Sequence, residues 1–195
     1  MNSTAIDAGC SADNLALYIS ISVGIFALLF TVFSFWWMNW RTGRLIVGPP
    51  RSYAALSQGE ENLLIIQLPL VFLNDGPVTY VVYNLRLTLE QEDKKSAILY
   101  FNNTVSKLTS DDNREWARQF AVEGNNSYSS IFVFQRKPGK FIFSAGKCKA
   151  TLEAKLNTDK KWRTLITFDL QTPEAIITTL NGHQLITYDN DPDRE

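Results

Sequence analysis

Thr79–Glu90 reads TYVVYNLRLTLE, in which apolar and polar side chains alternate over most of the length. Alternation with a period of two residues is typical of a β-strand with one buried and one solvated face. The apolar side chains that we expect to face inward are Val81, Tyr83, Leu85, Leu87 and Leu89. The polar side chains that we expect to face outward are Asn84, Arg86, Thr88 and Glu90.

The same pattern recurs further along the chain. Thr151–Leu156 and Trp162–Leu170 also alternate, the second with Trp162 expected on its inward face. Leu63–Leu73 is apolar on both faces, which fits either a strand covered on its second side or an edge strand that carries Pro69. The remaining strand candidates are Arg44–Val47, Tyr53–Leu56, Ala97–Phe101, Trp116–Val122 and Ser130–Gln135.

Turn signals separate these strands. Asn74-Asp75-Gly76-Pro77 and Pro138-Gly139 follow two of them, and Asn181-Gly182 predicts a two-residue type I′ hairpin between AIITTL and HQLITY. Long amphipathic helical windows are missing, which argues against alternating βαβ units. We therefore predict an all-β domain, specifically an immunoglobulin-like antiparallel β-sandwich, with a small barrel as the alternative.

A long uncharged stretch precedes the strands: Leu15–Met38, LALYISISVGIFALLFTVFSFWWM. At about 1.5 Å per residue such a helix reaches roughly 36 Å, enough to cross a hydrocarbon layer of about 30 Å. The residues before it lack the basic side chains of a secretory signal peptide, so we expect one uncleaved transmembrane α-helix. The predicted division is a polar tail at 1–14, the transmembrane helix at 15–40, a juxtamembrane linker at 41–52 and the β-sandwich domain at 53–195.

The flanks of this stretch give it a direction. Arg41, Arg44 and Arg51 follow it, whereas no Lys or Arg precedes it. The positive-inside rule then places the N-terminus outside and the C-terminal domain in the cytoplasm. Aromatic and basic side chains favour the headgroup zone of a membrane. The predicted membrane-interface residues are Trp36, Trp37, Trp40, Arg41 and Arg44.

One face of the predicted helix carries small side chains within a sector of roughly 80°. Small residues let a second helix approach closely, and their hydroxyls can bond across the contact. Self-association or a partner helix is one interpretation, and the other is that small residues are simply common in membrane helices. The candidate helix–helix contact residues are Ala16, Ser20, Gly24, Ala27, Thr31 and Ser34.

Four runs of sequence carry a resemblance: WRTGRLIVGPP at 40–50, LPLVFLNDGPV at 68–78, KATLEAKL at 149–156 and KWRTLITFDL at 161–170. In this order, after an apolar anchor, they resemble single-pass membrane proteins with an immunoglobulin-like β-sandwich domain, a family of unknown function. An Asn-centred early strand after an anchor is also similar to domains of late-embryogenesis-abundant type. The resemblance implies the layout and the fold class, and it implies no activity.

Groups suited to catalysis are sparse. His183 is the only histidine, and the sequence has neither a G-x-S-x-G elbow nor paired ligands at zinc spacing. Cys10 and Cys148 lie on opposite sides of the apolar stretch, so we expect no disulfide. The prediction is therefore no enzyme, with no catalytic residue, metal site, cofactor or small-molecule substrate. The near-neutral charge after Trp40 argues against a nucleic-acid partner.

Two weaker signals concern the surroundings of the domain. Residues 136–149 contain five cations and no acid, which fits either a surface facing anionic lipid or an ordinary solvated face. Glycosylation sequons occur at Asn2, Asn102 and Asn125, and in the predicted orientation only Asn2 is accessible to that modification.

These observations lead to one expected function and one alternative. We expect a single-pass, membrane-anchored β-sandwich that acts as a non-enzymatic binding or assembly module. The alternative is an accessory subunit of a larger membrane complex, held through its transmembrane helix. The expected partners are membrane lipid and a protein that binds through the helix, which can be a second copy of the chain.

Overall fold

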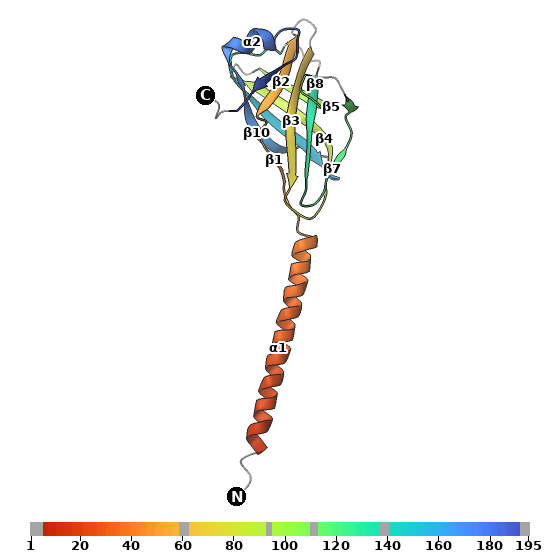
Figure 1. Ribbon diagram of the computed structural model, residues 1–195, viewed down its shortest axis with the longest axis vertical. Helices are drawn as coiled ribbons and strands as arrows, with labels where there is room; N and C mark the ends of the chain where they lie inside the picture. Colours follow the sequence, from red (N-terminus) through yellow and green to blue (C-terminus); the bar gives the residue numbers. More distant parts are fainter. Residues whose placement is uncertain (1–5, 59–62, 93–94, 110–112, 137–140, 192–195) are drawn as a thin grey trace. The chain divides into compact units, whose positions relative to one another are not determined.

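The computed structural model describes residues 6–58, 63–92, 95–109, 113–136 and 141–191. The chain divides into two compact units, Met1–Thr42 and Gly43–Glu195. In the described residues, the first unit is built on helix α1 (Ile6–Asn39) and the second consists mostly of β-strands (Figure 1). The predicted class, mostly β with one apolar N-terminal helix, is confirmed.

All described strands of the second unit join one antiparallel sheet. Its main path runs β10-β9-β4-β5-β8-β3-β2-β11, while β1 pairs with β3, β6 with β5 and β7 with β4. The elements are β1 (Leu45–Val47), β2 (Ser52–Gln58), β3 (Leu63–Asn74), β4 (Tyr80–Gln91), β5 (Ser96–Val105), β6 (Glu115–Trp116), β7 (Phe120–Val122), β8 (Ser127–Arg136), β9 (Gly146–Leu156), β10 (Arg163–Thr172), α2 (Glu174–Leu180) and β11 (Ile186–Asp189).

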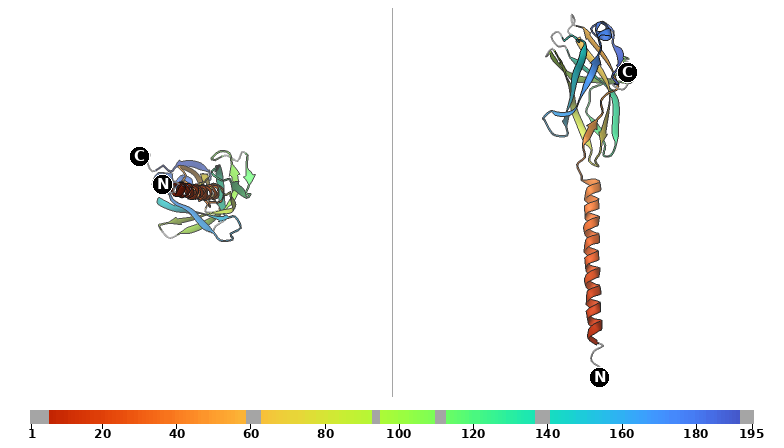
Figure 2. Two further views of the ribbon diagram at one scale, coloured as in Figure 1. Left: turned by 90° about the horizontal axis from the view of Figure 1, so that it is seen from below. Right: turned by 90° about the vertical axis from the view of Figure 1, so that its left-hand side faces the viewer.

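The sheet curls into an open half-barrel, as the two views in Figure 2 show. Side chains connect its two ends. The Tyr53 hydroxyl in β2 donates to the carbonyl of Gln171 in β10 at 2.6 Å. Asn190, directly after β11, accepts from the Gln171 backbone N–H at 2.8 Å and donates to the Asp169 carbonyl at 3.0 Å. The two ends of the path, β10 and β11, therefore lie beside each other. The bonds described between them come from side chains, and no strand pairing joins these two strands in the described sheet.

Strand β3 is central in this sheet. Residues 64–73 pair with β8 on one side, while on the other side 63–67 pair with β2 and 72–74 pair with β1. Pro69 lies in the stretch 68–71 that neither β2 nor β1 pairs, so its missing N–H interrupts no ladder on that side. Of the two interpretations of Leu63–Leu73, the covered central strand is confirmed for its first half.

The inner face of the curled sheet holds one apolar core. Leu64, Ile66, Leu68, Leu70 and Phe72 of β3 are all buried there. Aromatic rings fill the space between strands: the Phe72 and Phe132 rings meet edge to face with centroids 5.3 Å apart. In β9 the predicted alternation is confirmed, because its inward residues Leu152, Ala154 and Leu156 are buried.

The start of β4 differs from the alternation predicted for it. Val82 is 1% exposed and Tyr83 is 44% exposed, so the expected inward position of Tyr83 is wrong. A β-bulge between Val82 and Asn84, in the pairing with β9, shifts the register by one residue. A shift of one residue moves a side chain to the opposite face, and beyond the bulge Leu85, Leu87 and Leu89 are buried as expected.

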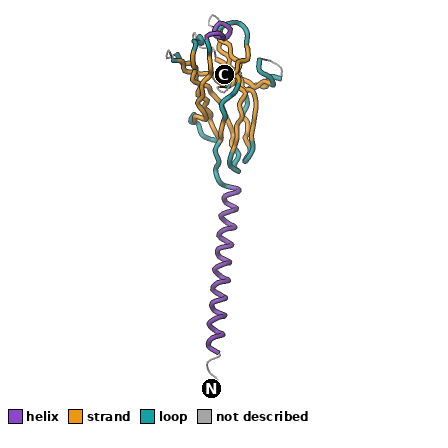
Figure 3. Tube along the Cα trace, turned by 60° about the vertical axis from the view of Figure 1, so that its left-hand side comes forward, coloured by secondary structure: helices purple, strands orange, loops and turns teal. Residues whose placement is uncertain are grey.

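The predicted Asn181-Gly182 hairpin is wrong. The preceding residues form the short helix α2, visible in Figure 3 as the one purple element among the strands, and Asn181 is its C-cap with φ −95°. A type I′ turn needs positive φ at both central residues. The Asn181 side chain instead accepts from the Phe143 N–H and donates to its carbonyl, both at 2.9 Å, and Leu180 is buried. Tertiary contacts have therefore overridden the local turn signal.

The predicted linker at 41–52 differs as well. Its residues 45–47 are strand β1, whose pairing with β3 is antiparallel from Leu45↔Asn74 to Val47↔Phe72. Pro50 is buried, and its carbonyl accepts from the Asn190 side chain at 3.1 Å. The Gly-Pro-Pro run at 48–50 therefore lies inside the β unit and connects β1 to β2.

Candidate functional site

Helix α1 carries most of the residues selected from the sequence. Among the described residues, its segment Leu15–Asn39 is the one helix long and apolar enough to cross a membrane, and none of that segment is buried within the protein. A signal sequence near an N-terminus meets the same criteria of length and composition.

The C-terminal end of α1 gathers aromatic rings. The Trp36 and Trp37 ring centroids lie 6.4 Å apart, and Phe35 meets Trp40 edge to face at 5.4 Å. The guanidinium carbon of Arg41 lies 4.9 Å from the centroid of the Trp37 ring, within cation–π range. Four of the five predicted interface residues therefore lie together in and just after the last turn of the helix.

The fifth, Arg44, belongs to the β unit. Its side chain is exposed, and its backbone N–H donates to the Asp75 carboxylate. In return the Asp75 N–H donates to the Arg44 carbonyl at 3.2 Å. Arg44, just before β1, is therefore hydrogen-bonded to Asp75, just after β3. The sequence pattern did not predict this contact.

The six small residues lie on the exposed surface of α1, except that Ser34 is half-buried. A Cβ added at Gly24 meets nothing within 4 Å, so the helix itself does not require glycine there. The hydroxyls of Ser20 and Thr31 donate to the carbonyls of Ala16 and Ala27, at 2.9 and 2.8 Å. These two hydroxyls are therefore bonded within their own helix, as is common for Ser and Thr in apolar helices.

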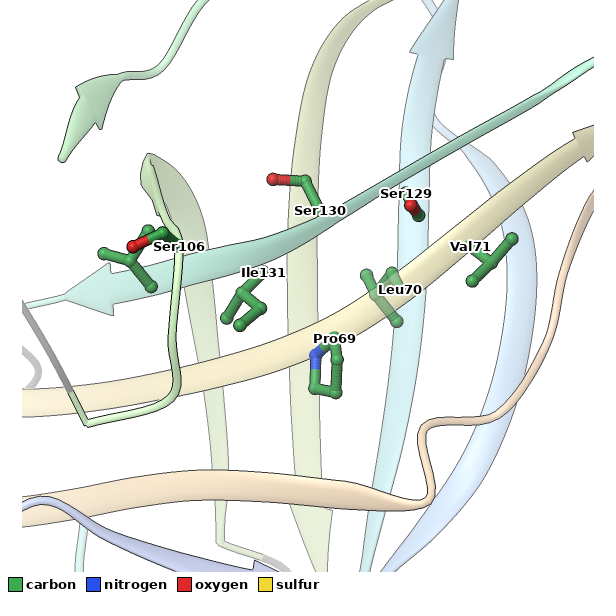
Figure 4. A pocket seen from close by; sticks show the side chains of 8 residues that line it. Pro69, Leu70, Val71, Ser106, Ser129, Ser130 and Ile131 are labelled. Atoms are coloured by element: carbon green, nitrogen blue, oxygen red, sulfur yellow. The ribbon is translucent and has the colours of Figure 1, made fainter. Parts of the chain in front are cut away.

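The β unit carries a shallow groove on β3 and β8, with a volume of about 380 Å³ (Figure 4). The backbone N–H of Thr109, after β5, donates to the buried Gln67 side chain of β3 at 2.9 Å. Among the described residues, no charged side chain lines the groove. Its lining residues are Pro69, Leu70, Val71, Val105, Ser106, Ser129, Ser130 and Ile131.

A second groove, of about 420 Å³, lies where β4 and β5 diverge. The two strands pair only from Arg86↔Tyr100 to Glu90↔Ser96, and the segment between β6 and β7 crosses the resulting fork. This groove is more polar than the first. It is lined by Tyr83, Asn84, Phe101, Ala117, Arg118 and Gln119.

The described titratable groups form no recognisable catalytic set. Burial raises the pKa of the Cys148 thiol to about 12, which leaves it protonated and unreactive at neutral pH. His183 is exposed, and its Nδ1 lies 3.5 Å from the Gln58 side-chain nitrogen. Within the described part of the chain, no three His, Cys, Asp or Glu side chains gather where they could hold a metal ion.

A half-buried ion pair of the β unit lies on its outer face. Arg86 binds Glu153 through two hydrogen bonds, of 2.6 and 2.9 Å, and the Arg86 side chain also lies over the Trp162 ring at 4.5 Å. This contact places Trp162 outside the core, contrary to its predicted inward position. Hydrogen bonding from Arg86 holds the pKa of the Glu153 carboxyl below its ordinary value.

Sequence reasoning missed one surface, a group of exposed aliphatic side chains on β1 and β3. Ile46, Val71 and Leu73 are 45%, 51% and 46% exposed. The apolar second face of Leu63–Leu73 was the available signal. Its exposed part could not be separated from its buried part without the strand pairing.

No protein-family model matches the sequence, and no curated protein matches it. An ApaA protein from Bordetella pertussis is similar in structure with a TM-score of 0.38 and 8% identity, covering 69% of this chain and 98% of that chain. A family 123 glycoside hydrolase from Clostridium perfringens, described for glycolipid glycan hydrolysis, has a TM-score of 0.36 and 10% identity, covering 67% of this chain and 27% of that chain. Likenesses this distant carry no conclusion about what this chain binds or does.

Proposed function

We propose that this chain is a membrane-tethered β protein that acts as a non-enzymatic binding or assembly module. One observation carries the proposal: Leu15–Asn39 is a continuous apolar helix, and none of it is buried among the residues that the structure describes. Large exposed apolar surfaces mark sites that bind membranes or partners, and this one is long enough to cross a bilayer. The tryptophans and Arg41 at its C-terminal end suit the headgroup zone.

The mechanism is confinement. A span through Leu15–Asn39, with the N-terminus outside and Arg41 inside, holds the β unit at the cytoplasmic face of the membrane. Confinement to a surface raises the effective concentration of the β unit for neighbouring proteins without any new contact. This mechanism needs no catalytic group.

The immunoglobulin-like arrangement of the strands belongs to the same proposal. Its support is the path of β5, which pairs with β4 over its first half and with β8 over its second. A bulge between Phe101 and Asn103 lies within the pairing with β8, just after the last residue that pairs with β4. Strands that change sheets at a bulge make the corners of sandwich folds.

Two measurements test the anchor and its direction in sealed vesicles. The full chain should float with the vesicles after alkaline carbonate extraction, and protease added outside right-side-out vesicles should leave the β unit intact. Release by carbonate overturns the anchor. Complete digestion from the outside overturns the cytoplasmic assignment and leaves the anchor in place.

The accessory-subunit alternative predicts a different set of partners. Purification in mild detergent should then recover stoichiometric partners with a fusion that retains only residues 1–42. If the chain is a binding module, the full chain should recover partners that the fusion lacking the β unit does not. The two outcomes separate the alternatives.

A further inference from the structure

Three exposed aliphatic side chains, Ile46 of β1 and Val71 and Leu73 of β3, form what we call the aliphatic strip. Ile46 is the register partner of Leu73, and partners in an antiparallel pair point to the same face. Val71 is two residues from Leu73 along β3, so its side chain shares that face. The strip is therefore one continuous surface.

On the β8 side, the strip has polar, uncharged neighbours in the strand pairing. The register partners of Val71 and Leu73 in β8 are Ser129 and Ser127, both exposed. Beyond Val71 the strip continues into the groove over Pro69 (Figure 4), whose described lining residues are all uncharged. On the β1 side, Arg44 precedes the strip with an exposed side chain.

The chain itself limits how far the strip can lie from the end of the candidate span. Ile46 is six residues after Trp40 in the sequence. A fully extended chain covers at most about 3.6 Å per residue, so roughly 22 Å separate their Cα atoms at most, whatever the arrangement of the two units. If Trp40 lies in the headgroup zone, Ile46 is within reach of the same zone.

We propose that the aliphatic strip contacts the bilayer surface, with Val71 and Leu73 inserted among the lipid headgroups when α1 spans the membrane. This inference rests on the proposed anchor. The composition of the strip favours lipid over a protein partner. Protein-binding surfaces concentrate Trp, Tyr and Arg and cover about 800 Å² per partner, whereas the strip offers three aliphatic side chains beside serines.

The test uses the full chain in nanodiscs of phosphatidylcholine and phosphatidylglycerol, in a Cys10→Ser background. Spin labels are attached at Val71→Cys or Leu73→Cys. The matched control is Ser96→Cys. Ser96 is exposed at the start of β5 and pairs with Glu90, near the C-terminal end of β4. The measurement is the accessibility of each label to oxygen and to a water-soluble nickel complex, by power saturation.

We expect the oxygen-to-nickel accessibility ratio at Val71 and Leu73 to be several-fold higher than at Ser96. Equal ratios at all three positions overturn the proposed lipid contact of the strip. The anchor is still supported in that case if the protein floats together with the discs. Loss of the protein from the discs counts against the anchor itself. Dipolar broadening of the spectrum of the label at Leu73→Cys, if it disappears on dilution with unlabelled chain, shows that the strip contacts a second copy of the chain. That result overturns the lipid contact.

Discussion

The side chain of Asn190 donates a hydrogen bond of 3.0 Å to the backbone carbonyl of Asp169 and so connects the segment after β11 to β10. The same amide group donates to the Pro50 carbonyl at 3.1 Å, and its oxygen accepts from the Gln171 N–H at 2.8 Å. One buried side chain thus holds three chain segments together where the sheet is open.

Asn190→Ala should destabilise the β unit by about 2–4 kcal/mol, because it removes these bonds and leaves backbone groups of Asp169, Pro50 and Gln171 without them. Urea unfolding followed by tryptophan fluorescence measures the change. The control is Gln184→Ala, at an exposed position in the same C-terminal segment. Equal effects of the two substitutions would show that Asn190 does not hold the sheet ends together.

Glu153→Gln should remove a pH-dependent part of the stability. The pKa of Glu153 is lowered in the folded protein, mainly by its hydrogen bonds from Arg86. Its contribution is therefore present above the ordinary glutamate pKa of about 4.3 and is lost as the pH falls through the lower folded value. As the pH is lowered from 7 to 3, the unfolding free energy should decrease more steeply for the natural chain than for the variant. Parallel curves would contradict the assignment.

The Cys148 thiol should be protected from modification in the folded protein. Its pKa of about 12 reflects burial, so the thiolate that reacts is scarce near pH 8. In a Cys10→Ser variant, we expect an aromatic disulfide reagent to react at least about 100-fold more slowly in buffer than in denaturant. Because the folded pKa is raised, burial of the neutral thiol stabilises the fold below about pH 8.5, and this contribution is lost as the pH rises towards the folded value. Fast labelling of the native chain is the contrary result.

Gly24→Ile tests whether the small-residue face of α1 contacts another helix. A Cβ added at Gly24 meets nothing within 4 Å beyond the neighbouring backbone of its own helix, so α1 has room for the larger side chain. The accessory-subunit alternative and self-association both predict weaker assembly in a membrane dimerisation or co-purification assay. Phe26→Leu, about 200° away around the helix, is the matched control. Unchanged assembly with Gly24→Ile removes the helix contact from consideration.

The sequons provide a test of orientation with an internal control. The Asn102 amide donates to the Gln135 side chain at 2.9 Å, whereas Asn125 is exposed with φ 53° at the end of a turn. In eukaryotic microsomes the proposed orientation predicts no glycan at either position. The reversed orientation should give a glycan at Asn125 and little or none at Asn102. Mass spectrometry of the glycosidase-treated sites distinguishes the two topologies.

The sequence by itself determined the residues that alternate and the residues that stay apolar. Leu85, Leu87 and Leu89 are buried as the pattern predicts, because side chains of a paired strand must alternate between the two faces of the sheet. The apolar segment Leu15–Asn39 follows equally directly from composition, since no charge interrupts it. Both features depend on properties of neighbouring residues only.

The tertiary structure alone decided where the pattern breaks. The bulge before Asn84 depends on the pairing of β4 with β9, and the helix before Asn181 depends on contacts with Phe143. The partly exposed second face of β3 depends on where β2 ends and β1 begins along it. Each of these is a relation between segments distant in sequence, and local propensities carry no information about such partners.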